Sequence, residues 1–384
     1  REKECPWDAE TCHCAAEGGH LEVLQWLEAE SYPRPFSKEV CEAAAYGGHC
    51  HVLDWLSPHW CGNESRVPQS EWDGIVSNLW EHAGRGGRYE VLRKLALSED
   101  CNRINASELP LGVDAATSGA ALGGQLELLQ AMARDAFGFA DAPAYLRYLQ
   151  RFGGDLHWKA AKYGHLRVIE WLRDQGLSIS APGSRNHKTL CNAAVYSGSV
   201  ELVKWLAVEA APFFMDDIMF DNASLSGSVE MLEWLKERGL PFTHDGILSP
   251  SNVISSGGVR MGHYGVVEWV TEQEGFPGFS QYTMASAASA GQVDLYDWLV
   301  KEKECPCDYR EVCELAIRNG HGHMVRWAAA QEGFEWTPSL YIWTKEKPHT
   351  ERWLEERGCP RRRRPHHRGN FHGVVHDLQP ATAD

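Results

Sequence analysis

The sequence predicts an all-α solenoid of about ten to eleven helix-turn-helix repeats joined by short turns. Three observations support this fold class. A ten-residue segment recurs ten times along the chain, small residues precede most copies, and the shortest spacing between copies is constant. One such unit is too small to bury its own apolar side chains, so neighbouring units must stack into a continuous core.

The recurring segment carries glycine at its second position. It reads GGHLEVLQWL at 18–27, YGHLRVIEWL at 163–172 and SGSVEMLEWL at 226–235. Alignment of all copies gives ten aligned glycines: Gly19, Gly48, Gly87, Gly124, Gly164, Gly198, Gly227, Gly262, Gly291 and Gly320. An eleventh copy at 345–354 keeps only the final Trp-Leu pair.

The spacing of the aligned glycines has a constant minimum. It is 29 residues at four steps, for instance from Gly19 to Gly48, and 5 to 11 residues longer at the others. Chance similarity would not return the same shortest period. We therefore expect a 29-residue unit with longer insertions near 57–78 and 133–155.

Each unit is predicted to contain two helices that meet at the aligned glycine. Alanine-rich runs such as 41–45 and 284–289 precede the glycine, and alanine is the best helix former. Glycine ends this first helix because it adopts a left-handed backbone without steric cost. Apolar residues then recur at helical spacing, as at Leu21, Leu24 and Leu27, which predicts a second helix with a wide buried stripe.

A recurring turn connects the units. KECPWD at 3–8 and KECPCD at 303–308 are versions of one another. Proline cannot continue the second helix, and the following Asp8 or Asp308 can begin the next first helix.

These residues resemble ankyrin repeats. The stretch Thr11–Leu24 follows the family pattern, with its Ala-Ala and Gly-His pairs in register, and the resemblance extends over 1–357. The Cys-Pro-Trp-Asp turn and the Trp-Leu helix end are similar to a subtype found in algae and large viruses.

Two features depart from the family pattern. The Thr-Pro-Leu-His opening of the first helix is missing, and only His13 falls where its histidine would be. The period is about 29 residues instead of about 33. The missing residues would come from the β-hairpin finger between units, so we expect short turns instead of full fingers.

The resemblance implies both a domain organisation and a function. Residues 1–357 would form one ankyrin-type solenoid, followed by a basic, disordered tail at 358–384. Solenoids of this family bind other proteins and carry no catalytic chemistry of their own. We therefore predict a non-catalytic protein–protein interaction scaffold that uses its concave helical face and its inserted loops.

The composition restricts the partners and the compartment. The 384 residues include 37 basic and 53 acidic ones, and the net charge of −16 disfavours nucleic acid and favours a basic protein partner. No apolar stretch approaches the roughly 20 residues of a membrane-spanning helix, and the charged N-terminus lacks a signal-peptide core. We expect an intracellular monomer, cytoplasmic or nuclear, with its 12 cysteines reduced.

The cysteine clusters are not predicted to bind metal. Cys12, His13 and Cys14 are consecutive, so their side chains point about 100° apart around a helix and chelate poorly. We expect Cys12 and Cys14 to be small buried thiols. The same interpretation applies to Cys305, Cys307 and Cys313. No metal, no cofactor and no catalytic motif is predicted.

The recurring histidines and the recurring tryptophans are both predicted to have structural roles. Histidine follows the aligned glycine at His20, His49, His165, His263 and His321. These histidines lie one repeat apart and cannot converge on one substrate, so we expect them to bond backbone groups of the inter-helix loop. Tryptophan ends nine of the second helices, beginning with Trp26, and we expect these rings to be core residues between second helices.

At one position of the repeat the residue type changes from unit to unit, as expected where each unit makes a different contact with a partner. It lies two residues before the aligned glycine, at the predicted exposed end of the first helix. Its residues, called here the pre-glycine row, are Glu17, Tyr46, Arg85, Leu122, Lys162, Tyr196, Leu225, Arg260, Ser289 and Arg318. We predict that the row contacts the partner protein, although an unconstrained solvent position would vary in the same way.

The insertions are the other candidate contacts. Residues 57–78 place Trp60 and Trp72 among turn formers, and we predict that both contact the partner. Residues 133–155 carry Phe137, Phe139, Tyr145 and Tyr148. Alternatively, these lengthenings only patch degenerate repeats.

Two other functions remain open from the sequence. Arg361–Arg364 could be a nuclear-import or nucleic-acid patch, which would make the chain a nuclear factor. The chain begins inside a repeat turn at Arg1, so it could also be the adaptor portion of a larger enzyme.

Overall fold

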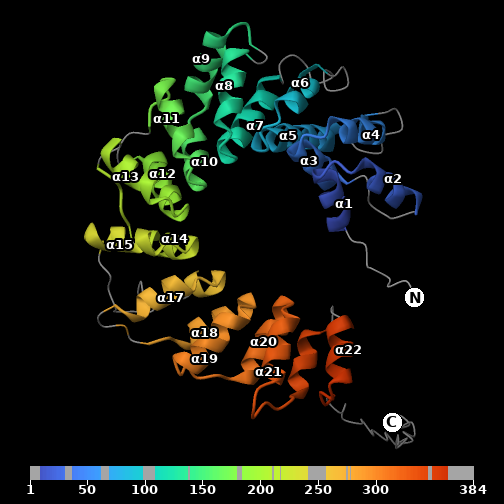
Figure 1. Cartoon of the computed structure of the whole chain (residues 1–384), viewed down its shortest axis with the longest axis vertical. Coiled ribbons are helices and arrows are strands. Elements are labelled where there is room, and N and C mark those ends of the chain that lie inside the picture. Colours follow the sequence, from blue (N-terminus) through green and yellow to red (C-terminus); the bar gives the residue numbers. More distant parts are fainter. Residues whose placement is uncertain are drawn as a thin grey trace, which may run out of the picture. The chain divides into compact units, whose positions relative to one another are not determined.

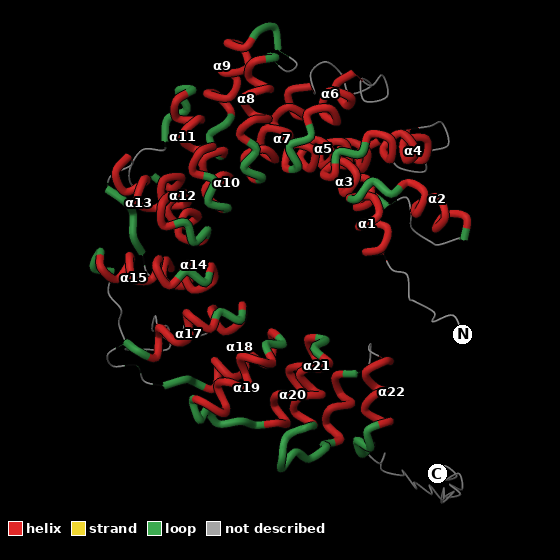
Figure 2. The backbone as a smooth tube through the Cα atoms, in the orientation of Figure 1, coloured by secondary structure: helices red, strands yellow, loops and turns green. Residues whose placement is uncertain are grey.

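The computed structural model describes residues 9–30, 37–61, 69–97, 109–136, 139–179, 184–209, 212–216, 218–240, 257–273, 276, 278–344 and 348–361. The chain divides into two compact units, unit 1 from Arg1 to Gly278 and unit 2 from Phe279 to Asp384. Helices and loops make up the described residues, and no strand occurs among them (Figure 2). The predicted all-α class is confirmed.

Unit 1 is built from pairs of helices. The first helices are α1 (Ala9–Glu17), α3 (Lys38–Gly47), α5 (Gln69–Arg85), α7 (Leu109–Leu122), α10 (Leu156–Lys162), α12 (Arg185–Tyr196), α14 (Ile218–Ser226) and the helical residues 257–261. The second helices are α2 (Leu21–Ala29), α4 (Cys50–Cys61), α6 (Tyr89–Leu97), α8 (Leu126–Arg134), α11 (Leu166–Asp174), α13 (Val200–Glu209), α15 (Val229–Glu237) and α17 (Tyr264–Thr271).

The pairs of unit 1 stack in chain order. First helices pack on one another from α1 through α3, α5, α7, α10 and α12 to α14. The second helices form a separate layer beside them (Figure 1), with α4 on α6, α8 on α11 and α13 on α15. Buried Leu24, Ala44 and Leu129 are examples of the side chains that fill the space between the helices. They belong to one apolar core that extends along the unit.

Unit 2 repeats the arrangement on a smaller scale. Its helices are α18 (Gln281–Ala290), α19 (Val293–Glu302), α20 (Tyr309–Asn319), α21 (Gly322–Ala329), the 3₁₀ helix η1 (Pro338–Trp343) and α22 (Pro348–Glu356). First helix α18 packs on α20, and second helix α19 packs on α21. The 3₁₀ helix η1 packs on α20, where the degenerate eleventh copy has no regular first helix.

The aligned glycines end the first helices as predicted. All ten have a positive φ, from 68° at Gly124 to 88° at Gly48. At Gly48 the backbone N–H donates to the carbonyl oxygens of Ala44 and Ala45 at the end of α3. A side chain would strain this left-handed backbone, which explains why glycine is kept here in every complete copy.

Several other glycines allow neighbouring repeats to approach. A Cβ on Gly47 would lie 2.2 Å from the carbonyl oxygen of Glu17 in the preceding repeat. Between α5 and α7, a Cβ on Gly119 would lie 2.0 Å from the carbonyl oxygen of Glu81. Small residues at the end of the first helix therefore set how closely the repeats pack.

The connection between α19 and α20 is short, as predicted. Residues 303–308 join the two helices without a strand. The Asp308 carboxylate accepts hydrogen bonds from the backbone N–H groups of Arg310 (2.9 Å) and Glu311 (3.2 Å), and so caps α20. Its counterpart Asp8 lies outside the described residues.

The aromatic residues near 133–155 build structure instead of an exposed loop. Tyr145 and Tyr148 lie on an additional helix, α9 (Ala142–Phe152), which packs on α8. Tyr145 is fully buried and its hydroxyl lies 3.0 Å from Oγ1 of Thr117, so the prediction that it could serve an interface is wrong. Phe139 packs edge-on against Tyr145. Phe137 lies outside the described residues.

The tryptophans at the ends of the second helices differ in burial. Trp234 and Trp269 are buried, as expected for core residues. Trp26 is 46% exposed, so the prediction of a core ring is wrong there. The buried positions of α2 are taken by Leu24 and Leu27, which leaves Trp26 at the edge of the apolar stripe.

Candidate functional site

The residue after the aligned glycine links several repeats of unit 1 to the preceding repeat. Nε2 of His49 donates to the carbonyl oxygen of Glu17 at 2.8 Å. His165 donates in the same way to Leu122 (3.0 Å), and His263 donates to Leu225 (3.1 Å). The expected backbone bonds of these histidines are confirmed, and they cross from one repeat to the next. We call this series of bonds the ladder.

Two other residue types form the same bond, which the sequence analysis missed. Nε of Arg88 donates to the carbonyl oxygen of Tyr46 (2.9 Å), and Nε2 of Gln125 donates to that of Arg85 (3.1 Å). A long side chain with an N–H at its end reaches the same acceptor. The sequence does carry a sign of this role, because Arg88 and Gln125 directly follow the aligned glycine, where other repeats have histidine.

Two repeats of unit 1 carry serine at this position and behave differently. Oγ of Ser199 accepts a hydrogen bond from the backbone N–H of Leu202 (3.3 Å). Oγ of Ser228 accepts one from Met231 (3.2 Å). Both serines therefore cap their own second helix and do not reach back to the preceding repeat.

The carbonyl groups that accept the ladder bonds belong to the pre-glycine row. Each bonded carbonyl, from Glu17 to Leu225, is held by a side chain of the following repeat. The side chains of the row are never buried in the structure. Glu17, Tyr46, Arg85, Tyr196, Arg260 and Arg318 are exposed, and Leu122, Lys162, Leu225 and Ser289 are partly exposed. The main chain is thus held at five positions of the row, while the side chains of the row face solvent.

Cations and aromatic rings gather at the ends of α5 and α10. The guanidinium group of Arg85 lies 5.7 Å from the ring centre of Tyr163, and Nζ of Lys162 lies 5.6 Å from the same ring. Tyr163 also stacks on His165 and remains 45% exposed. Tyr163 was not predicted as a site residue, although it stands directly before the aligned glycine, where four of the ten repeats have glycine.

A cavity of about 300 Å³ lies between the α9–α10 turn and the start of α12. It is lined by Phe152, Gly154, Asp155, His157, Trp158, Arg185, Asn186, Thr189 and Leu190. His157 is 5% exposed, and its Nε2 has no hydrogen-bond partner. Burial lowers the pKa of His157 to about 4, so the ring is neutral at pH 7.

A second cavity, of about 270 Å³, lies in unit 2 beside the turn 303–308. The hydroxyl of Tyr296 donates to Sγ of Cys307 at 3.6 Å within its wall. Burial raises the pKa of the Cys307 thiol, and it raises that of Cys313 to about 12. Cys305 and Cys313 are buried, so these two have the environment of the small buried thiols that were predicted.

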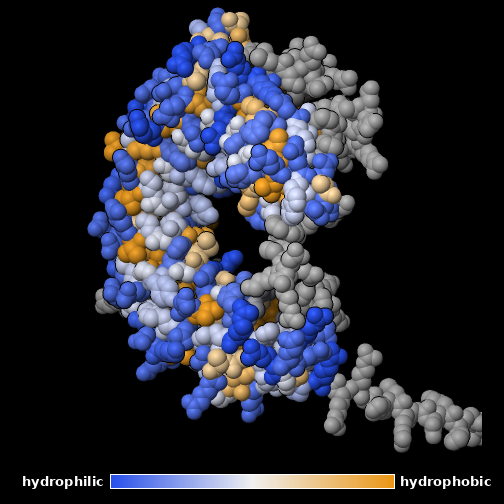
Figure 3. Space-filling model, turned by 45° about the vertical axis from the view of Figure 1, so that its right-hand side comes forward, coloured by the Kyte–Doolittle hydropathy of each residue, from blue (hydrophilic) through white to orange (hydrophobic). Residues whose placement is uncertain are grey.

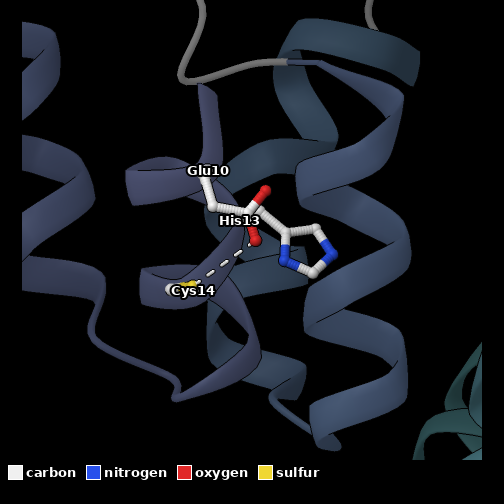
Figure 4. Close-up of side chains that lie close together, drawn as sticks. All are labelled: Glu10, His13 and Cys14. Carbon is white, nitrogen blue, oxygen red and sulfur yellow. Dashed lines mark hydrogen bonds between the residues drawn. The ribbon is translucent and has the colours of Figure 1, made fainter. Parts of the chain in front are cut away.

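The first cysteine cluster is arranged differently from the prediction. Cys12 is fully buried, but Cys14 is exposed, so the prediction of two buried thiols is wrong for Cys14. Two residues correspond to about 200° around a helix, which places the two thiols on nearly opposite sides. Instead, Glu10, His13 and Cys14 lie together on α1 (Figure 4).

Several predicted contacts lie outside the described side chains. These are Trp60, Trp72 and Arg362–Arg364. Arg361 is described, and it forms ion pairs with Glu351 (2.9 Å) and Glu355 of α22. Its charge is therefore already paired within unit 2.

In the described part of the chain, no helix is both long enough and apolar enough to span a membrane. Comparison with curated proteins finds no match. Residues 156–207 match the family of ankyrin repeats in many copies. The matched segment runs from α10 to α13 and contains the glycine-ended helix pair that recurs in the other repeats. Residues 156–207 are therefore ankyrin repeats.

Proposed function

We propose that this protein is a non-catalytic scaffold that binds a partner protein through the side chains of its pre-glycine row. Ankyrin repeats generally mediate protein–protein interaction. The observation that carries the finer proposal is the ladder, because it holds the backbone at five positions of the row and leaves the side chains at the surface.

A surface of this kind is suited to selective binding. The carbonyl of Tyr46 is held by Arg88, and that of Arg85 is held by Gln125, so neither segment has to be ordered when a partner arrives. Preorganisation lowers the entropic cost of association. The residue type changes from repeat to repeat, which gives each position a different contact.

The proposed partner is a protein with a net positive charge. The net charge of −16 attracts basic partners over long distances. The visible surface in Figure 3 is mostly hydrophilic, with smaller hydrophobic areas between. Tyr46 and Tyr196, which are 38% and 43% exposed, would supply the aromatic contacts that dominate many interfaces.

The cavity at His157 would receive one partner side chain. Trp158 and Phe152 offer apolar contact. A cavity with apolar walls is a typical place for an anchoring residue. Arg361 is not part of the proposed surface, because it is paired with Glu351 and Glu355.

Affinity capture with a matched pair of variants tests this function. The row variant changes Tyr46, Tyr196 and Arg260 to Ala. The control variant changes three exposed second-helix residues, Glu22, Glu201 and Val208, to Ala. The ladder bonds are accepted by backbone carbonyl oxygens, which remain when a side chain of the row is replaced by Ala. Both variants should therefore unfold at nearly the same midpoint as the wild-type protein.

We expect the control to retain the captured partner and the row variant to lose it. Three contacts of about 1 kcal/mol each would weaken binding by more than 100-fold. Equal capture by the row variant and wild type would contradict the proposal.

A further inference from the structure

One face of α1 brings together three different metal-ligating side chains. Ligand atoms of Glu10, His13 and Cys14 all lie within 4.8 Å of one another, and in the described part of the chain no other group of three does so. The spacing is i, i+3 and i+4, which places side chains on the same face of a helix. Figure 4 shows the three residues on one helix, with Glu10 and Cys14 joined by a hydrogen bond.

We infer that Glu10, His13 and Cys14 bind a divalent transition-metal ion, with zinc as the best match. The group offers one carboxylate oxygen, one imidazole nitrogen and one sulfur, all of which are zinc ligands. Cys12, one residue from His13, is not part of the site because it is buried on the other side of α1.

The distances are close to those of a bound ion. Sγ of Cys14 lies 4.0 Å from Oε1 of Glu10. In a tetrahedral zinc site with bonds of about 2.0 to 2.3 Å, ligand atoms are separated by about 3.3 to 3.8 Å. Glu10 and Cys14 are exposed, so small rotations of their side chains can close this difference without moving the helix.

His13 supplies an independent observation. Its Nδ1 is buried and has no hydrogen-bond partner. The nearest carboxylate oxygen of Glu17 lies 3.9 Å away, beyond hydrogen-bond distance. A buried nitrogen without a partner is unfavourable, and a metal ion would satisfy it. Glu17 is then placed to complete the coordination or to leave the fourth position to water.

Cobalt(II) titration is the direct test, because a cysteine thiolate bound to cobalt gives a charge-transfer absorption band in the near ultraviolet. The experiment uses the full chain with a reductant that contains no thiol. Cys14→Ala removes a proposed ligand, whereas Cys12→Ala changes the buried thiol two residues away. His13→Gln and Glu10→Gln remove the other two ligands without adding bulk.

The wild-type protein and Cys12→Ala should bind the same number of cobalt equivalents, and zinc should displace the metal. Cys14→Ala should bind one equivalent fewer and lose the corresponding thiolate band. His13→Gln and Glu10→Gln should weaken that equivalent by at least about tenfold. Far-ultraviolet circular dichroism checks that every variant keeps its helices.

A stability measurement keeps the inference testable if other thiols also bind cobalt. Zinc should raise the midpoint of unfolding in wild type and in Cys12→Ala, but raise it less in Cys14→Ala and His13→Gln. The inference is overturned if Cys14→Ala and His13→Gln match wild type in cobalt stoichiometry, absorption and zinc response. Partner capture is unaffected by this result, because the row variant leaves α1 unchanged.

Discussion

The repeats from α3 to α11 and the repeats from α12 to α15 are joined by different means. In the former, His49, Arg88, Gln125 and His165 each reach back to a carbonyl of the preceding repeat. In the latter, Ser199 and Ser228 bond within their own repeats. The same position in the repeat therefore serves either to couple neighbours or to start a helix. The hydrogen bonds between neighbouring repeats therefore vary along the solenoid, although these repeats have the same fold.

The largest effect is expected where backbones pack most closely. Gly119→Ala would place a Cβ 2.0 Å from the carbonyl oxygen of Glu81 and push α5 and α7 apart. We expect a loss of about 3 kcal/mol in the free energy of unfolding, measured by urea denaturation.

Gly74→Ala is the matched control in α5. No atom lies within 4 Å of a Cβ at this position. Alanine should stabilise the helix there by about 0.5 to 1 kcal/mol. Equal losses in the two variants would show that close backbone packing is not the cause.

The second prediction concerns His157, which lies at the border between the two kinds of repeat. Its pKa is lowered from 6.5 to about 4 in the folded protein by burial. As the pH falls, the unfolded chain therefore binds the proton first. Stability should be complete above about pH 6.5, decrease as the pH falls to about 4, and lose about 3 kcal/mol over this interval.

The His157→Gln variant isolates this contribution from that of the other histidines. It should show a smaller loss of stability than wild type between pH 6.5 and pH 4 when urea midpoints are compared. An unchanged pH profile would mean that His157 titrates normally and is not buried in a neutral form. His323→Gln, which changes an exposed ring, serves as the control.

The third prediction removes one ladder bond. His165→Ala leaves the carbonyl of Leu122 without its side-chain donor. The expected loss is about 1 to 1.5 kcal/mol in the free energy of unfolding. His165→Gln should restore part of it, because Gln125 already makes the equivalent bond one repeat earlier. No recovery would indicate that ring packing, and not the hydrogen bond, gives the stability.

The smallest effect belongs to the serine repeats. Ser199→Ala removes the cap on the N–H of Leu202 and should cost about 0.5 to 1 kcal/mol. Ser199→Asp should retain most of the stability, since aspartate is an equally good cap. A loss larger than that of His165→Ala would reverse the proposed order of the two regions.

The sequence predicted much of the fold because its main signals are local. Glycine at the end of each first helix has one physical reason, and all ten aligned glycines have the left-handed backbone. The alanine-rich runs and the apolar residues at helical spacing likewise predicted the two helices of each unit. These features depend on neighbours a few residues away in the chain.

The candidate sites were less predictable because they depend on contacts between repeats. Arg88 takes the place of histidine in the ladder because its side chain is long enough to reach the carbonyl oxygen of Tyr46. Its position in the repeat suggests this role, but the residue type alone does not show that the distance fits. Cys12 and Cys14 could not be distinguished until the rotation of α1 against α3 was known. His157 gives no signal in the sequence, because only the packing of the residues around it shows that Nε2 is buried without a hydrogen-bond partner.

Hydrogen–deuterium exchange of His165→Ala and Ser199→Ala tests the central claim most directly. If the ladder couples repeats, His165→Ala should speed amide exchange at the end of α7, in the preceding repeat, as well as in its own repeat. Ser199→Ala should speed exchange only at the start of α13. Faster exchange confined to the mutated repeat in both variants would contradict the account.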